Sequence, residues 1–186
     1  MRSVAARSTA AGVVLALAGG ALAARAVKDP RTLVLQKSDL PARAVKGPSA
    51  TASPSTFGDR EFTVYFNLSA GKREEVLTSD VAVSGTGKRA ATGYRIMLAT
   101  YTGLPGSSPY KLPAYGDGQR AEYQPDPGRG VLVVHKGKVV WQLVLEDCGP
   151  QSPAGCLGGV TPPRLTRPQA LAELEKYAPK QERRVR

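Results

Sequence analysis

Two β-branched, apolar runs, at residues 131–134 and 139–145, are the sequence feature that most constrains the fold. They are joined through Lys136 and Gly137, so the chain can reverse direction within a few residues. Apolar runs of this length on either side of a short, glycine-containing turn are typical of a β-hairpin. We therefore expect an antiparallel pair of strands in this part of the chain.

Three more strands are expected. Between residues 61 and 68, apolar and polar residues alternate, as they do in a half-buried strand. The apolar positions are Phe62, Val64, Phe66 and Leu68. Residues 76–83 place Leu77, Val81 and Val83 on one face of a second strand, and residues 119–124 form a short third one before the turn that follows. Together with the hairpin, these strands predict a mostly antiparallel sheet.

Two helices are expected as well. Apolar residues recur with the spacing of one helix face between residues 86 and 101, at Ala90, Tyr94, Met97, Leu98 and Tyr101. Near the end of the chain, Thr166 and Gln169 have the spacing of a capping box, and Pro168 suits a first helical turn. This second helix is expected over residues 167–178. The first helix should lie across the sheet.

The fold class that follows is α+β, with a mostly antiparallel sheet of about five to six strands, one long helix packed on it and a C-terminal helix. The single domain is expected at 57–178. A basic, partly disordered segment at 24–56 precedes it, with Leu33, Val34, Leu35 and Leu40 pinning that segment to the domain, and a basic tail at 179–186 follows.

The start of the chain predicts a secretory signal peptide at residues 1–23. Arg2 and Arg7 precede an apolar stretch at 10–22, and small residues lead up to a cleavage site near Ala23. A secreted or extracellular protein of the cell envelope is expected, with an uncleaved anchor as the alternative. No cysteine lies near the cleavage site, so the lipid attachment of a bacterial lipoprotein is not expected.

Two cysteines, Cys148 and Cys156, flank a turn-rich loop, and in an exported chain such a pair predicts a disulfide. They do not have the spacing of a redox CxxC pair. The one histidine, His135, cannot complete a zinc site with them. We expect no metal and no cofactor.

The formal net charge is +11, but the basic residues gather at 24–46 and 180–186, and residues 47–178 are close to neutral. A nucleic-acid groove needs basic residues grouped on the folded surface, so no nucleic-acid partner is expected. Weak contact between the basic ends and an anionic surface, such as lipid headgroups or wall polymers, stays open.

No catalytic set is evident. His135 falls at the tip of the expected hairpin, and Ser84 to Arg89 lacks the spacing of a phosphate-binding loop. The acids nearest the strand ends are Asp117, Glu122, Glu146 and Asp147, and they support a carboxylate-based hydrolase only as an alternative. Asp117, between two glycines, is expected to be a turn residue.

Aromatic residues offer one candidate binding site. Trp141 alternates with Val139 and Leu143 and should point inward, against Tyr94, Met97 or Tyr101. This group, beside the long proline- and glycine-rich loop that carries Tyr110 and Tyr115, forms either core or the lining of an apolar ligand pocket.

The segment LVLQKSDLP from Leu33, the Gly116-Asp117 pair, the KGK turn and the closing amphipathic helix together carry a resemblance. The chain resembles exported proteins of high-GC Gram-positive bacteria, some of which are similar to the α+β sandwich shared by PsbP and Mog1. This resemblance implies a helix-flanked antiparallel sheet and no settled activity. Relatives in mycobacteria are similar in layout to lipid-handling envelope proteins, which implies lipid binding, although the lipid-attachment cysteine is missing here.

The function predicted from the sequence is that of an exported, non-catalytic domain that binds an apolar or amphipathic ligand or another envelope component. A carboxylate-based extracellular hydrolase and a polyanion-binding envelope protein are the alternatives.

Overall fold

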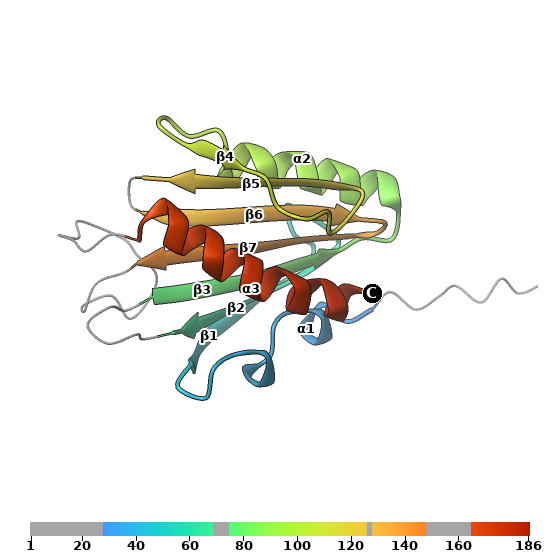
Figure 1. Cartoon of the computed structure of the whole chain (residues 1–186). Helices are drawn as coiled ribbons and strands as arrows, with labels where there is room; N and C mark the ends of the chain where they lie inside the picture. Colours follow the sequence, from blue (N-terminus) through green and yellow to red (C-terminus); the bar gives the residue numbers. More distant parts are fainter. Residues whose placement is uncertain (1–27, 69–74, 126–127, 148–164) are drawn as a thin grey trace, which may run out of the picture.

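The computed structural model describes residues 28–68, 75–125, 128–147 and 165–186, and the expected signal peptide and both cysteines lie outside these ranges. The elements follow one another in chain order (Figure 1). They are α1 (Pro30–Leu33), the short 3-10 helix η1 (Lys37–Asp39), β1 (Val45–Ala52), β2 (Arg60–Asn67), β3 (Glu75–Val83), α2 (Gly87–Tyr101), β4 (Ser108–Tyr110), β5 (Gly118–Gln124), β6 (Arg129–Lys136), β7 (Val139–Asp147) and α3 (Arg167–Val185).

The strands form one antiparallel sheet in the order β1-β2-β3-β7-β6-β5-β4. The α+β class and the central hairpin are confirmed, since β6 pairs with β7 from Lys136 opposite Val139 onward. In the described residues the sheet has seven strands, so the expected count of five to six is corrected. Both unexpected strands, β1 and β4, are edge strands. An edge strand with little burial shows no apolar alternation, and β1 is exposed along almost its whole length.

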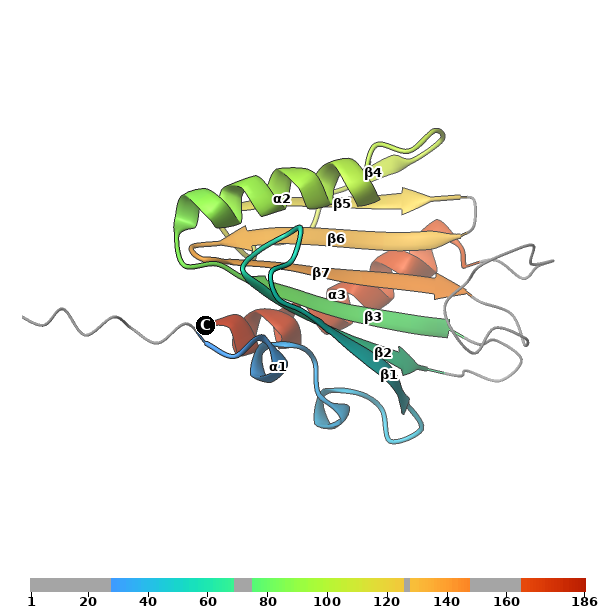
Figure 2. The same ribbon diagram turned by 180° about the vertical axis from the view of Figure 1, so that it is seen from behind.

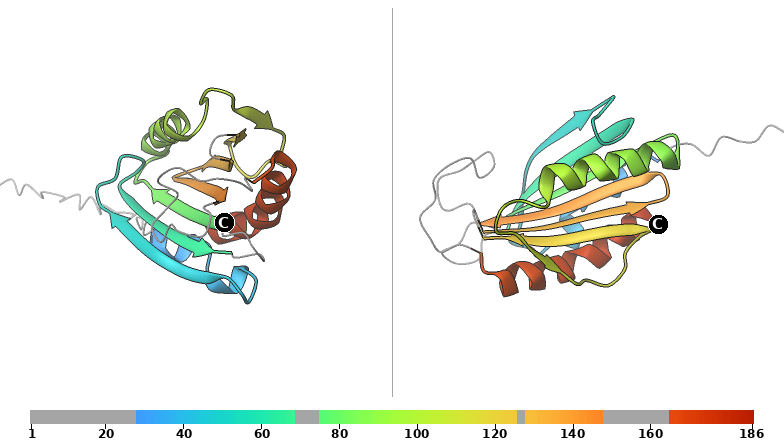
Figure 3. Two further views of the ribbon diagram at one scale, coloured as in Figure 1. Left: turned by 90° about the vertical axis from the view of Figure 1, so that its left-hand side faces the viewer. Right: turned by 90° about the horizontal axis from the view of Figure 1, so that it is seen from above.

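Helices cover both faces of the sheet. Helix α3 crosses one face together with α1, and α2 lies on the opposite face (Figures 1 and 2). The view from above in Figure 3 shows α2 and α3 on the two sides of the strands. Among the described residues, no helix has the length and apolarity needed to cross a membrane.

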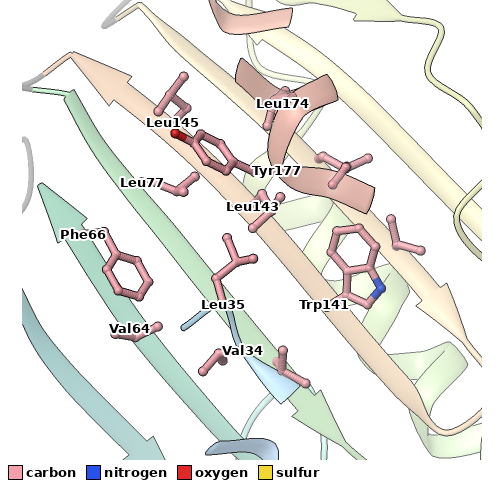
Figure 4. Packing of buried hydrophobic residues seen from close by; sticks show 14 of the residues in the cluster. Val34, Leu35, Val64, Phe66, Leu77, Trp141, Leu143, Leu145, Leu174 and Tyr177 are labelled. Carbon is pink, nitrogen blue, oxygen red and sulfur yellow. The ribbon is translucent and has the colours of Figure 1, made fainter. Parts of the chain in front are cut away.

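The larger core lies between the sheet and α3 (Figure 4). One set of alternating strand residues supplies it, including Phe66, Leu77, Trp141 and Leu143, all of which are buried. Leu174 and Tyr177 of α3 pack against this set. The expected anchoring of the N-terminal segment is confirmed, because the following residues are all buried in the same core: Leu33, Val34, Leu35 and Leu40.

The smaller core lies under α2. Ala90 and Met97 pack against Val131, Val133, Val140 and Val144 of the two central strands. Gly93 allows α2 to approach the chain at Phe57, since a Cβ atom at Gly93 would lie 1.7 Å from the Phe57 carbonyl oxygen. The expected helix at 86–101 is thereby confirmed, with Thr86 as the N-cap whose hydroxyl accepts from the Arg89 amide.

The last helix is longer than expected. The prediction that it ends near residue 178 is wrong, because α3 continues through Pro179 to Val185. Buried contacts hold the additional turns: Gln181 and Val185 face the core, and Arg184 Nε lies 2.5 Å from Asp39 Oδ2. Proline normally disrupts a helix interior, but here tertiary packing outweighs that cost.

Candidate functional site

The six residues expected to form a ligand site lie on two different faces of the sheet. Tyr94, Met97 and Tyr101 belong to α2 and its small core. Trp141 and Tyr115 belong to the larger core on the α3 side, with their ring centroids 6.3 Å apart, and Tyr110 packs against the same core. The expected packing of Trp141 against α2 is therefore wrong, because the sheet separates them. The six residues do not form one site.

Several of these residues have structural partners. Met97 is fully buried, and Tyr94 stacks on His135 with ring centroids 5.8 Å apart. The Tyr110 hydroxyl donates to the Arg167 carbonyl over 3.2 Å, and the Arg167 guanidinium lies 5.4 Å from the Tyr110 ring centroid. Burial raises the pKa of Tyr110 well above its ordinary value.

The acids considered for hydrolysis are engaged by the chain's own groups. Asp117 Oδ2 accepts from the Gly137 amide over 2.7 Å, as expected of a turn residue. Buried Glu122 accepts from the Gly103 amide over 2.6 Å and forms an ion pair with Arg120. Glu146 pairs with Arg129 at 2.9 Å, and Asp147 is buried at the far end of β7.

The turn before α2 holds an internal carboxylate where an anion could otherwise bind. Asp59 Oδ2 accepts from the Gly85 amide over 2.6 Å, and Asp59 Oδ1 lies 3.7 Å from Arg89 Nε. At the hairpin tip, His135 Nε2 lies 3.0 Å from the Gly137 carbonyl oxygen. The segment from Ser84 to Arg89 is thus a strand-to-helix turn, in which the Gly85 amide donates to Asp59 and the Arg89 amide donates to Thr86.

The basic residues near the C-terminus are also used within the fold. Lys180 Nζ donates to the Asp39 carbonyl over 2.5 Å, Arg184 pairs with the Asp39 carboxylate, and Arg186 pairs with Glu182 at 2.9 Å. Three of the four cations expected in a basic tail therefore have partners of their own: Lys180 and Arg184 on α3, and Arg186 directly after it. A polyanion would have to compete with these contacts.

A polar cluster that the sequence did not indicate lies beside α2. Cross-strand register places Thr63 of β2, Asp80 of β3 and Gln142 of β7 in one row across the sheet, on the α2 side. Asp80 and Gln142 are each 2% exposed, and Gln142 Nε2 donates to Asp80 Oδ2 over 3.2 Å. We call this group, with its half-buried neighbours Glu61, Tyr65 and Tyr101, the Asp80 cluster.

The charges of the cluster act on one another. Burial raises the pKa of the Asp80 carboxyl well above its ordinary range, and the neighbouring carboxylate of Glu61 raises this pKa further. Burial also raises the pKa of Tyr101; the hydrogen bond from Gln142 opposes this, and the Asp80 and Glu61 carboxyls add to it. Asp80 is thus held in its protonated form to higher pH than an ordinary aspartate.

Two oxygens of the cluster lack partners. Within the described ranges, Asp80 Oδ1 and Gln142 Oε1 are buried and have no hydrogen-bond partner. Almost all buried polar atoms in proteins are paired, so orphaned acceptors call for a specific explanation. Figure 2 shows α2 running along β5 and β6 on this face of the sheet, and Val140 and Val144, which flank Gln142 on the same face of β7, pack in the small core under α2.

Nothing in the one-dimensional pattern singles out Asp80. Glu75 is a second acid in the same strand β3, and Gln142 lies within the apolar hairpin. A polar residue at an inward position of each of two strands is the only available indication, and only the register brings the two together. In the described part of the chain, no group of three or more His, Cys, Asp or Glu side chains is placed to hold a metal ion.

No family model, curated protein or solved structure matches this chain. The site therefore has to be argued from its own geometry.

Proposed function

We propose that this chain is an exported, non-catalytic domain that binds an amphipathic component of the cell envelope at the Asp80 cluster. The observation that carries the proposal is the pair of buried acceptors, Asp80 Oδ1 and Gln142 Oε1, without partners in the residues described above. An unpaired buried polar atom costs about 1–3 kcal/mol, so a ligand that supplies the missing donors gains affinity from both.

The surroundings of these oxygens support a ligand with an apolar part. Tyr65 and Tyr101 are half-buried, and the Phe57 ring centroid lies 6.2 Å from that of Tyr101. Aromatic rings beside a small number of polar groups are the usual composition of a small-molecule site. The polar end of the ligand would pair with Asp80 and Gln142, and its apolar end would lie along the rings.

Binding is favoured over hydrolysis by the state of the other candidate groups. Glu122 and Glu146 are in ion pairs with arginines, and Asp117 holds a turn. A general acid or base must be able to exchange its proton with a substrate, and these carboxylates already serve the fold.

The proposal is tested by nuclear magnetic resonance. The ¹⁵N-labelled protein is titrated with two amphiphiles of the same chain length, neutral 1-hexanol and cationic hexylammonium chloride. We expect at least one of them to shift amide signals at residues 61–65, 78–82 and 142. A Tyr101→Ala variant should weaken this binding, whereas Tyr110→Ala, which truncates a half-buried tyrosine on the α3 side, should leave it unchanged. If neither probe shifts those amides, the proposed site is wrong.

A further inference from the structure

Among the described residues, no cation forms an ion pair with the two carboxyls of the Asp80 cluster. Ion pairs join Asp59 to Arg89 and Glu146 to Arg129, on either side of the cluster. None of the ion pairs found between the described residues includes Glu61 or Asp80. The half-buried Glu61 carboxylate is hydrogen-bonded to the Asp80 carboxyl and has no cation to offset its partial loss of hydration.

The two orphaned atoms are both acceptors. Gln142 Oε1 can only accept, and Asp80 Oδ1 accepts whenever the carboxyl is ionised or carries its proton on the other oxygen. A ligand that complements them must therefore bring hydrogen-bond donors. Because Glu61 lies beside them, a positive charge on that ligand is favoured as well.

We propose that the Asp80 cluster binds a primary ammonium group carried on an apolar stem, an inference that rests on the proposed function and names its ligand. The –NH3⁺ group has three donors, which match Asp80 Oδ1, Gln142 Oε1 and the Glu61 carboxylate in number and in charge. The stem would lie against the faces of Tyr65 and Tyr101, where a cation also gains from the aromatic ring.

A metal ion fits the cluster less well. Calcium takes six to eight oxygen ligands, usually with several carboxylates, and no group of three acids, histidines or cysteines converges anywhere in the described chain. The rings of Tyr65 and Tyr101, which form the aromatic rim of the cluster, add no ligand for such an ion. It does provide the surface that an alkyl stem needs.

Access requires a movement at the rim. Asp80 and Gln142 are 2% exposed, so a ligand reaches them only when a half-buried neighbour turns aside. Tyr65 and Tyr101 are the two neighbours with the longest side chains, and side chains of partly exposed residues change rotamer rapidly. The ammonium group then replaces a rim contact with charged hydrogen bonds.

Binding should be linked to a proton. The titratable groups beside Asp80 are Glu61 and Tyr65 on β2 and Tyr101 on α2. Glu146 on β7, which is paired with Arg129, acts on Tyr65. An ammonium group beside Asp80 favours the ionised carboxylate, so binding releases the proton that burial retains. The affinity should rise with pH, by up to about tenfold per pH unit, until Asp80 is ionised in the free protein.

The test compares hexylammonium with its neutral isostere 1-hexanol and with hexyltrimethylammonium, which has the charge but no N–H donor. We expect hexylammonium to bind at least about tenfold more tightly than either, since hydrogen bonds from a charged donor are stronger than neutral ones and hexyltrimethylammonium has no N–H donor. Calorimetry in two buffers of different ionisation enthalpy should show proton release below the pKa of Asp80. Calcium chloride should not displace hexylammonium.

Variants separate the contributions. Asp80→Asn keeps the shape of the side chain and should lower hexylammonium affinity at least about tenfold and abolish proton release. Should Asp80→Asn fail to fold, Glu61→Gln at the half-buried edge of the cluster should likewise lower hexylammonium affinity. Glu175→Gln removes one carboxylate from the exposed face of α3 and should change nothing. Equal binding of 1-hexanol, or displacement by calcium, would overturn the ammonium inference while leaving a ligand at this face. Binding of neither probe would overturn both proposals.

Discussion

Gln181 offers a sharp test of how the two ends of the chain are held together. It is fully buried in α3, its Nε2 donates to the Leu33 carbonyl over 2.6 Å, and its Oε1 accepts from Ser79 Oγ over 2.7 Å and from the Leu35 amide over 3.1 Å. One side chain thereby joins the segment after α1, the centre of β3 and the last turns of α3. We predict that Gln181→Met, which preserves the length of the side chain, destabilises the fold.

The magnitude follows from what the substitution leaves behind. The Leu35 amide keeps its second acceptor, Ser79 Oγ, at 3.0 Å. The Leu33 carbonyl and the Ser79 hydroxyl proton lose their partners, and each buried unpaired group costs about 1–3 kcal/mol. Burial of the methionine side chain offsets a part of this, so we expect the free energy of unfolding to fall by about 2–4 kcal/mol. In a chain of this length that corresponds to a melting temperature lower by roughly 5–15 °C.

The assay is urea unfolding followed by the fluorescence of Trp141, the single tryptophan, which is fully buried. Glu175→Met changes an exposed position of the same helix and should stay within about 0.5 kcal/mol of the parent protein. Hydrogen exchange at the Leu35 amide should accelerate in Gln181→Met. A loss of less than about 1 kcal/mol in the free energy of unfolding, with unchanged exchange at Leu35, would refute the role assigned to Gln181, because two unpaired buried groups should cost more than that.

Three other substitutions test separate parts of the structure. As pH rises through the raised pKa of Asp80, the parent should lose stability by up to about 1.4 kcal/mol per pH unit, whereas Asp80→Asn has no carboxyl to titrate there. The free energy of unfolding of Asp80→Asn should therefore rise relative to that of the parent, and parallel pH profiles of the two proteins would contradict this. Gly93→Ala should lower the free energy of unfolding by at least about 2 kcal/mol, since its Cβ would lie 1.7 Å from a backbone oxygen. In thermal melts, Gly87→Ala, whose Cβ would lie 3.5 Å from its nearest atom, should stay close to the parent. Burial raises the pKa of Asp39, but hydrogen bonds from Arg184 and the Gln36 amide lower it overall. Asp39→Asn should therefore destabilise the protein at neutral pH by about 1 kcal/mol, and that difference should vanish as pH falls through the lowered pKa. An unchanged difference at pH 2 would rule this out.

The elements predicted correctly are those in which one local pattern decides the structure. The hairpin at β6 and β7 has β-branched runs on both sides of a glycine turn, and α2 has five apolar residues on one face. The edge strand β1 contains Gly47 and Pro48 and is exposed, so it carries no burial pattern to detect. The end of α3 was misplaced because Pro179 normally stops a helix, whereas Gln181 and Val185 are held by distant residues.

The candidate site depended on which helix covers each face of the sheet, and the alternation of apolar and polar residues along a strand does not carry this information. Alternation correctly places Trp141 with Val139 and Leu143 on one face of its strand, but it cannot say which helix covers that face. Since α3 covers it, Trp141 belongs to the larger core and Gln142, the next residue, faces the α2 side. If the two faces of β7 are assigned the wrong way round, Trp141 is expected on the α2 side, where the structure has the polar side chain of Gln142 beside Asp80.

The two faces of β3 show why the Asp80 cluster is better explained by function than by folding. On the α3 face, the fully buried Ser79 is satisfied by Gln181 and the Leu35 amide. On the α2 face, Asp80 is equally buried and keeps an oxygen without a partner, as does Gln142 beside it. A valine at position 80 would remove the unpaired oxygen and the charge of a buried carboxyl, and stability alone would favour it. Asp80 and Gln142 are cross-strand partners, so their open acceptors lie together and form a polar surface suited to a donor from outside the fold.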